Sequence, residues 1–193
     1  MHLITHRQSA HRAAGFSLVE VMVALVVTSI GLLGLAKMES VALASTTVAG
    51  VRSLVAIQAY SLAAAMRANQ NYWAAGLFPG NTTITSSTSG GTITMVDSGA
   101  ASGLTTVGPS CTTLGACTLP VQVAAYDVQQ WAASLQSLLP TYLTTIACSN
   151  QVGVVVTCTI TIQWAENAVA WNATTQTQLS ALQSPSYTLY VQP

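Results

Sequence analysis

Charged residues are the scarcest class in this chain of 193 residues: only 5% are Asp, Glu, Lys or Arg, whereas 51% are hydrophobic. No run of like charges and no cluster of basic side chains occurs in the sequence. Binding of nucleic acid needs a basic face that neutralises phosphates. We therefore expect no nucleic-acid partner. The five basic and five acidic residues balance, so charge alone points to no other partner either.

Histidine is also scarce, and the titratable residues do not form a catalytic set. The histidines all lie near the N-terminus: His2, His6 and His11. The acids beyond the first 36 residues are far apart in the sequence: Glu39, Asp97, Asp127 and Glu166. Acid/base catalysis requires such groups to be held together. We expect no enzyme, no cofactor, no metal site and no small-molecule substrate, and we interpret Asp127 as a surface or hydrogen-bonding residue.

One long hydrophobic run stands near the N-terminus. Between Phe16 and Ala36, Glu20 is the only charged residue. At roughly 1.5 Å per residue, a helix of this length covers about 30 Å, the thickness of the hydrocarbon core of a bilayer. We therefore predict a transmembrane helix over about residues 16–36. A carboxylate inside a membrane is costly unless it is paired or protonated, so Glu20 is predicted to be functional.

The segment before this run has the composition of a leader. Met1 to Gly15 contains Arg7, Arg12 and the three histidines but no acid. A secretory signal peptide carries its small cleavage-site residue after the apolar core, whereas Gly15 comes before it. Cleavage after Gly15 would leave the apolar helix as the new N-terminus, with three basic and five acidic side chains in the mature chain. A plain signal anchor or an uncleaved membrane helix is the alternative.

This arrangement resembles the type IV prepilins, and the stretch GFSLVEVMVALVVTSIGLLGLA carries the resemblance. The resemblance implies that residues 1–15 are a leader peptide, that a prepilin peptidase cuts between Gly15 and Phe16, and that the Phe16 amine is methylated. It also implies a single-pass protein of the inner membrane with its head in the periplasm, which later packs with other pilins in a cell-surface pilus. We expect Glu20 to pair with the Phe16 amine of a neighbour and to favour one axial register.

Three later strings are similar to the PilV-type minor pilins. They are Tyr60 to Asn69 (YSLAAAMRAN), Ala125 to Trp131 (AYDVQQW) with Leu138-Leu139-Pro140 after it, and Cys158 to Trp164 (CTITIQW). This similarity implies a minor pilin that initiates pilus assembly or sits at the tip. A pseudopilin of a type II secretion system has the same N-terminal chemistry and is the alternative. A membrane-anchored binding module for DNA or a host surface is the third interpretation, although a basic, aromatic face for DNA is lacking.

Two glycines stand where many pilins have a proline inside the membrane helix. Gly31 and Gly34 each cost about 1 kcal/mol of helix propensity relative to alanine. They either mark a place where the helix loosens on assembly or let neighbouring helices pack closely.

The apolar pattern continues beyond Lys37 and Glu39 with a spacing of three to four residues. The positions are Val41, Ala44, Val48, Val51, Val55, Leu62 and Met66. Such spacing makes one stripe along an amphipathic helix. We predict one long helix over residues 16–71, whose first half meets lipid or other subunits and whose second half carries a head domain over residues 72–193.

The four cysteines indicate an oxidising compartment. Cys111 and Cys117 enclose a short loop, while Cys148 and Cys158 flank a predicted hairpin turn over residues 149–153. Three pairings are possible, and we favour the two local ones. A zinc site is the competing interpretation, but neither spacing is Cys-x-x-Cys and no histidine lies nearby.

The rest of the head is predicted to mix strands with one helix. Residues 82–87 and 92–96 read as a hairpin around Gly90-Gly91, and residues 142–148 and 153–164 as a second one. A helical period runs from Pro120 to Leu139, and residues 187–191 are a candidate edge strand. A long N-terminal helix packed on a small antiparallel sheet, with a second helix alongside, is a pilin-like α+β fold.

Overall fold

The computed structural model describes residues 15–78, 80–86, 92–99, 102–106, 111–112, 116–149, 154–166 and 184–193. The leader residues 1–14, the Gly90-Gly91 turn and residues 150–153 of the predicted hairpin turn lie outside the described residues. The chain divides into two compact units, Met1–Leu43 and Ala44–Pro193. Each unit is described by itself below.

The long N-terminal helix α1 spans Leu18–Ala68 and passes through Gly31 and Gly34 without a break. No proline interrupts these 51 residues, so every turn can keep its backbone hydrogen bonds. The predicted single helix to residue 71 is wrong at its C-terminal end. Asn69 leaves helical geometry at φ −115° and ψ 58°, and a separate short helix α2 follows over Gln70–Trp73.

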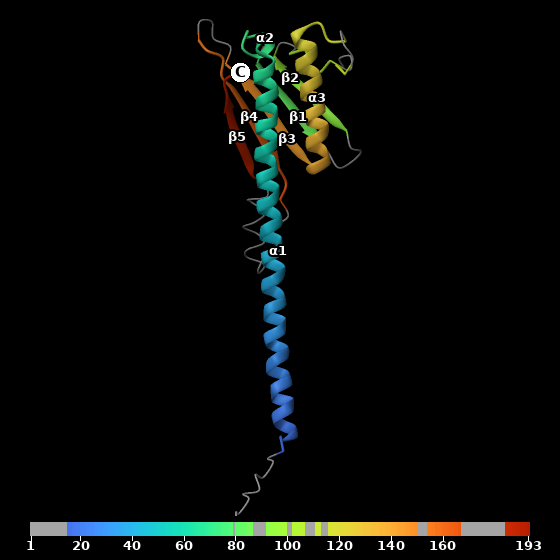
Figure 1. Ribbon diagram of the computed structural model, residues 1–193, viewed down its shortest axis with the longest axis vertical. Helices are drawn as coiled ribbons and strands as arrows, with labels where there is room; N and C mark the ends of the chain where they lie inside the picture. Colours follow the sequence, from blue (N-terminus) through green and yellow to red (C-terminus); the bar gives the residue numbers. More distant parts are fainter. Residues whose placement is uncertain are drawn as a thin grey trace, which may run out of the picture. The chain divides into compact units, whose positions relative to one another are not determined.

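Five strands form one antiparallel sheet in the order β2-β1-β3-β4-β5 (Figure 1). The strands are β1 (Gly80–Ser86), β2 (Ile93–Gly99), β3 (Tyr142–Cys148), β4 (Cys158–Trp164) and β5 (Ser186–Val191). Both predicted hairpins, β1 with β2 and β3 with β4, are present, and β5 is an edge strand as expected. The predicted α+β fold is confirmed.

The predicted strand over residues 153–164 begins too early. β4 starts at Cys158, and the described residues from 154 to 157 lie outside it. The register gives the reason, because Cys158 stands opposite Cys148, the last residue of β3. No β3 residue remains to pair with the segment before Cys158, although that segment is rich in valine.

The helix α3 spans Pro120–Leu138, close to the predicted bounds. Pro120 occupies the first turn, where its missing N–H costs nothing. The side-chain oxygen of Gln122 accepts hydrogen bonds from the backbone N–H groups of Thr118 (3.0 Å) and Leu119 (3.2 Å). The local sequence therefore sets where the helix begins, and Pro140 follows directly after its last turn.

One face of the sheet is buried against helices of the same unit, and Figure 1 shows the later part of α1 and α3 over that face. Apart from Asp97, the inward strand positions are apolar, aromatic or small, and they pack with Val55, Leu62 and Met66 from the predicted stripe of α1. The core includes Leu62 and Met66 from α1, Trp131 and Leu135 from α3, and Ile84, Ile146, Ile160 and Ile162 from the sheet. Alternation along each strand thus builds the head around the second half of α1.

The opposite face of the sheet is rich in threonine and carries no charged side chain at its described positions. The strand register aligns Thr83, Thr145, Thr161 and Thr188 in one row across four neighbouring strands. The hydroxyls of Thr161 and Thr188 are 3.3 Å apart. None of the outward residues on these strands is buried.

Candidate functional site

The N-terminal segment presents its key residues to the outside. Gly15, Phe16 and Ser17 precede the first helical residue, Leu18, and Glu20 lies in the first turn of α1. The side chain of Phe16 is 81% exposed. Gly15 has no atom near the position of an added Cβ. Among the described residues, nothing fills the space beside Gly15 or covers the side chain of Phe16.

Glu20 lies beside an apolar hollow of about 420 Å³ on the surface of α1. The hollow is lined by Phe16, Glu20, Val21, Ala24, Leu25 and Thr28. The Thr28 hydroxyl donates to the carbonyl oxygens of Ala24 (2.9 Å) and Leu25 (3.0 Å), so it is not directed to Glu20. No hydrogen bond or ion pair joins the Glu20 carboxylate to another residue in the described part of the chain. Any partner for this carboxylate must come from outside these residues.

The first part of α1 is long and apolar enough to cross a membrane. An 18-residue window of the helix has a mean hydropathy of 2.4, and none of it is buried within the chain. An added Cβ at Gly31 or Gly34 would meet open space. The helical surface of this segment is thus available to lipid or to neighbouring helices.

In the head, two contacts tie α1 to the later parts of the fold, and a third ties Asn69, directly after α1, to them. Arg52 donates to both carboxylate oxygens of Glu166, each at 2.9 Å, and Trp164 Nε1 donates to the same group at 3.1 Å. The Arg52 guanidinium lowers the pKa of Glu166, and burial acts in the opposite direction. Trp131 Nε1 donates to the Gln58 carbonyl at 2.8 Å, and Asn69 Nδ2 to the Pro120 carbonyl at 2.7 Å. The strings that resemble PilV-type pilins thus supply core residues and one partner, Asn69, Trp131 or Trp164, in three of these hydrogen bonds. Arg52 and Glu166 lie outside these strings.

Asp97 is the centre of a polar network that the sequence did not reveal. Thr82 Oγ1 and Ser102 Oγ each donate to Asp97 Oδ1 at 2.7 Å, and the Ser102 N–H donates to Oδ2 at 2.9 Å. Burial raises the pKa of Asp97, but these hydrogen bonds outweigh it and the pKa lies below its usual value. Gly103 follows with φ +77°, and a Cβ there would come within 2.6 Å of Val121. The network fixes the loop after edge strand β2.

The disulfides are Cys111–Cys117 and Cys148–Cys158, with Cα atoms 5.3 Å and 3.9 Å apart. These are the two local pairings favoured from the sequence. The second bridge joins the end of β3 to the start of β4, where the two cysteines face each other in the register. All four cysteines of the chain are thereby paired.

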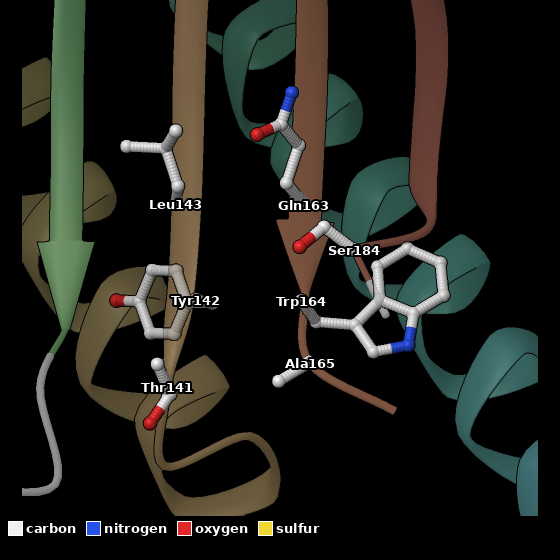
Figure 2. A pocket seen from close by; sticks show the side chains of 7 residues that line it. All are labelled: Thr141, Tyr142, Leu143, Gln163, Trp164, Ala165 and Ser184. Atoms are coloured by element: carbon white, nitrogen blue, oxygen red, sulfur yellow. The ribbon is translucent and has the colours of Figure 1, made fainter. Parts of the chain in front are cut away.

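A hollow of about 280 Å³ lies where β3 begins and β4 ends (Figure 2). Its lining is Thr141, Tyr142, Leu143, Gln163, Trp164, Ala165 and Ser184. Tyr142 stands opposite Trp164 in the register and donates its hydroxyl hydrogen to the Ala132 carbonyl at 2.9 Å. Burial raises the pKa of Tyr142 to about 12. None of the seven residues is an acid, a base or a histidine, so this hollow contains no acid/base pair.

Asp127 is half-buried on α3, and burial raises the pKa of its carboxyl group. Glu39 lies on α1, and Glu166 lies two residues after the end of β4. Among the described residues, no group of three His, Cys, Asp or Glu side chains is placed to hold a metal ion. The structure brings none of the described acids together into a catalytic pair.

Comparison with known protein families gives one match, and it covers the N-terminal segment. Residues 10–36 match the prokaryotic N-terminal methylation motif. No curated protein and no solved structure matches the chain. The matched segment contains Gly15, Phe16 and Glu20 and the first part of the apolar helix. Proteins with this type IV pilin-like motif are structural subunits that are processed by prepilin peptidase and assembled with other pilins. The long apolar helix and the motif are consistent with anchoring in a membrane before assembly, and the motif supports processing of the chain by prepilin peptidase.

Proposed function

We propose that the chain is a minor pilin of the PilV type, which initiates assembly of a type IV pilus or sits at its tip. Prepilin peptidase cuts between Gly15 and Phe16 and methylates the Phe16 amine. The mature protein is held in the inner membrane with residues 72–193 in the periplasm. It is then incorporated into the filament, where the first part of α1 packs with other subunits. The chain is a substrate and a building unit in this scheme, and it has no catalytic role.

The unpaired Glu20 is the observation that supports assembly into a filament, which a minor pilin and a pseudopilin share. Its carboxylate lies beside an apolar hollow, next to Phe16, and makes no hydrogen bond with another described residue. In a filament core of low dielectric, an unpaired carboxylate and an unpaired ammonium are each costly, whereas together they form charge-assisted hydrogen bonds. Cleavage after Gly15 creates such an ammonium at Phe16. Pairing Glu20 with the Phe16 amine of a neighbouring subunit would favour one axial register.

The head supports export to an oxidising compartment. Its two disulfides close short loops, and such bonds persist in the periplasm and outside the cell. A pseudopilin of a type II secretion system would need the same cleavage site and the same Glu20. The resemblance of three strings to PilV-type pilins is what favours the pilus. In the structure, Met66, Trp131 and Trp164 from these strings lie in the core of the head.

Mass spectrometry of pili sheared from cells tests the proposal. The expected species begins at Phe16, carries one added methyl group and is present in the filament fraction. Replacing Gly15 by leucine should leave the full precursor in the membrane, while the same change at Gly50, whose Cβ position is also open, should not affect cleavage. Mature protein found only with a secretion pseudopilus would support the alternative. An intact precursor as the stable form, absent from every fibre, would contradict both.

A further inference from the structure

The unit Ala44–Pro193 contains only five charged side chains: Arg52, Arg67, Asp97, Asp127 and Glu166. Three of them have partners inside the unit. Arg52 pairs with Glu166, and Asp97 receives hydrogen bonds from Thr82 and Ser102. The side chains of Arg67 and Asp127 form no hydrogen bond or ion pair with any described residue. One basic side chain, Arg67, and one acidic side chain, Asp127, are therefore without a partner in a head that has only three other charged side chains.

Asp127 faces a groove of about 330 Å³ between α1 and α3. Gln58, Ser61, Leu62 and Ala65 line it from α1, and Asp127, Gln130, Trp131 and Ser134 from α3. The hydrogen bond from Trp131 Nε1 to the Gln58 carbonyl joins the two helices at this place. The amide and hydroxyl oxygens in the lining can accept hydrogen bonds from a cationic group. The groove thus combines an unpaired, half-buried carboxylate with further acceptors, which suits a guanidinium.

Arg67 cannot supply that guanidinium to its own groove. It lies two residues after Ala65, and successive helical residues are about 100° apart, so the two side chains leave α1 about 200° apart. Arg67 is exposed, in the last turn of α1. Of the other basic residues of the mature chain, Arg52 is paired with Glu166 and Lys37 belongs to the N-terminal unit. Arg67 is the one basic side chain of the described head that is free to bind another molecule.

We propose that Arg67 of one copy of this chain enters the Asp127 groove of a second copy. The charges are complementary, and an arginine can bind a carboxylate through two parallel hydrogen bonds. The two patches differ, so the contact is heterologous and can repeat from copy to copy in a helical array. The proposal deepens the proposed function by naming a second copy of this chain as one neighbour, and it rests on that function in one respect, namely that assembly brings subunits side by side.

The test uses the full chain in its own cells, with two different tags on co-expressed copies. Cells are treated briefly with formaldehyde, the membranes are dissolved, and the capture of one tagged copy by the other is measured. Asp127→Arg alone and Arg67→Asp alone should each lower capture between identical copies about tenfold, because like charges then meet at the contact. A copy with Asp127→Arg should nevertheless capture a copy with Arg67→Asp at the wild-type level. That mixed pair retains one intact Arg67 and one intact Asp127 groove.

Thr188→Arg is the matched control, since it adds a positive charge to the outward face of the sheet and should leave capture unchanged. Thermal melting of each variant checks that the head is folded. The proposal would be overturned if wild-type copies did not capture each other. It would also be overturned if folded single variants captured as well as wild type, or if the mixed pair failed to capture. Filament content is measured in parallel. Wild-type chain in filaments without the mixed-pair rescue would reject this contact alone, whereas rescue without filaments would reject the proposed function alone.

Discussion

Leu25 and Leu62 are the same residue type in the same helix, but 62% of Leu25 is exposed whereas only 1% of Leu62 is. Leu25 belongs to the unit Met1–Leu43, in which none of the described residues is buried. Leu62 belongs to the unit Ala44–Pro193, where it lies in a closed core with α3 and the sheet. Large exposed apolar surfaces mark sites of contact with lipid or protein. The apolar side chains of the first unit are therefore free to contact lipid or other proteins, whereas those in the core of the second unit pack against one another.

The largest effect is expected from removing the Glu20 carboxylate, because its proposed partner belongs to a neighbouring subunit. Glu20→Ala should leave cleavage after Gly15 intact but lower the content of the chain in sheared filaments a hundredfold or more, because breaking a buried ion pair costs about 3–5 kcal/mol. Glu39→Ala is the control, since it removes an acid beyond the predicted membrane segment. Quantitative immunoblots of the filament and membrane fractions measure both. Normal incorporation of the Glu20 variant would show that this carboxylate has no such role.

The same substitution, leucine to alanine, at one α1 position in each unit tests whether the two units differ in this way. Leu62→Ala should lower the free energy of unfolding of the head by about 3–5 kcal/mol, because it removes a fully buried side chain and leaves a cavity. Leu25→Ala should change it by less than about 0.5 kcal/mol, since the exposed side chain has no contact to lose within the head. Urea titration of the purified mature chain in detergent, followed by tryptophan fluorescence, gives both values. Equal losses at the two positions would mean that the units do not differ in this way.

Removing the bridge between β3 and β4 should have a smaller effect, confined to the second unit. Replacing Cys148 and Cys158 together by serine should cost about 2–3 kcal/mol, because the sequence separation of 10 sets the loop entropy released on unfolding. The same exchange of Cys111 and Cys117, with a separation of 6, should cost slightly less. Thermal melts under oxidising conditions compare the two variants. An unchanged melting temperature in both would exclude a stabilising role for the bridges.

Acid should weaken the second unit through Asp97, and this is the smallest expected effect, about 1 kcal/mol. The folded-state pKa of Asp97 lies below its usual value, so its contribution to stability is present above about pH 4 and is lost as the pH falls through the lower folded value. Asp97→Asn should flatten the acid limb of a plot of stability against pH. Urea midpoints between about pH 2 and pH 6 measure it. An unaltered slope in the variant would assign the acid sensitivity to another group.

Local patterns predicted the elements of the fold well because their causes are local. The apolar run with its single acid predicted the start of α1, the period from Pro120 predicted α3, and short loops between cysteines predicted the bridges. The contacts that depend on distant residues were not predictable in this way. Arg52 and Glu166 are 114 positions apart, and nothing in the sequence near either residue indicates the other. β4 starts late because of its register with β3, and the valine-rich composition of the segment before it does not predict that register.

The candidate functional residues also fall into those that the sequence predicts and those that only the structure reveals. The sequence predicts roles for Gly15, Phe16 and Glu20 because they lie within one short motif, and residues 10–36, which match the methylation motif, contain all three. Their individual roles stay predictions. Asp97 looked like an isolated acid, since its hydrogen-bonding partners Thr82 and Ser102 are ordinary hydroxyl residues without a sequence signature. The groove beside Asp127 depends on how α1 packs against α3 and so required coordinates.

The threonine-rich outward face of the sheet has a consequence for experiments at different ionic strengths. Its described positions carry no charged side chain, so mobile ions have nothing there to screen. A partner held through this face would keep its affinity between dilute buffer and about 1 M salt, where the Debye length falls to about 3 Å. A partner held through Arg67 and Asp127 would lose affinity over the same range. A salt series therefore assigns a newly found partner to one surface or the other before any residue is changed.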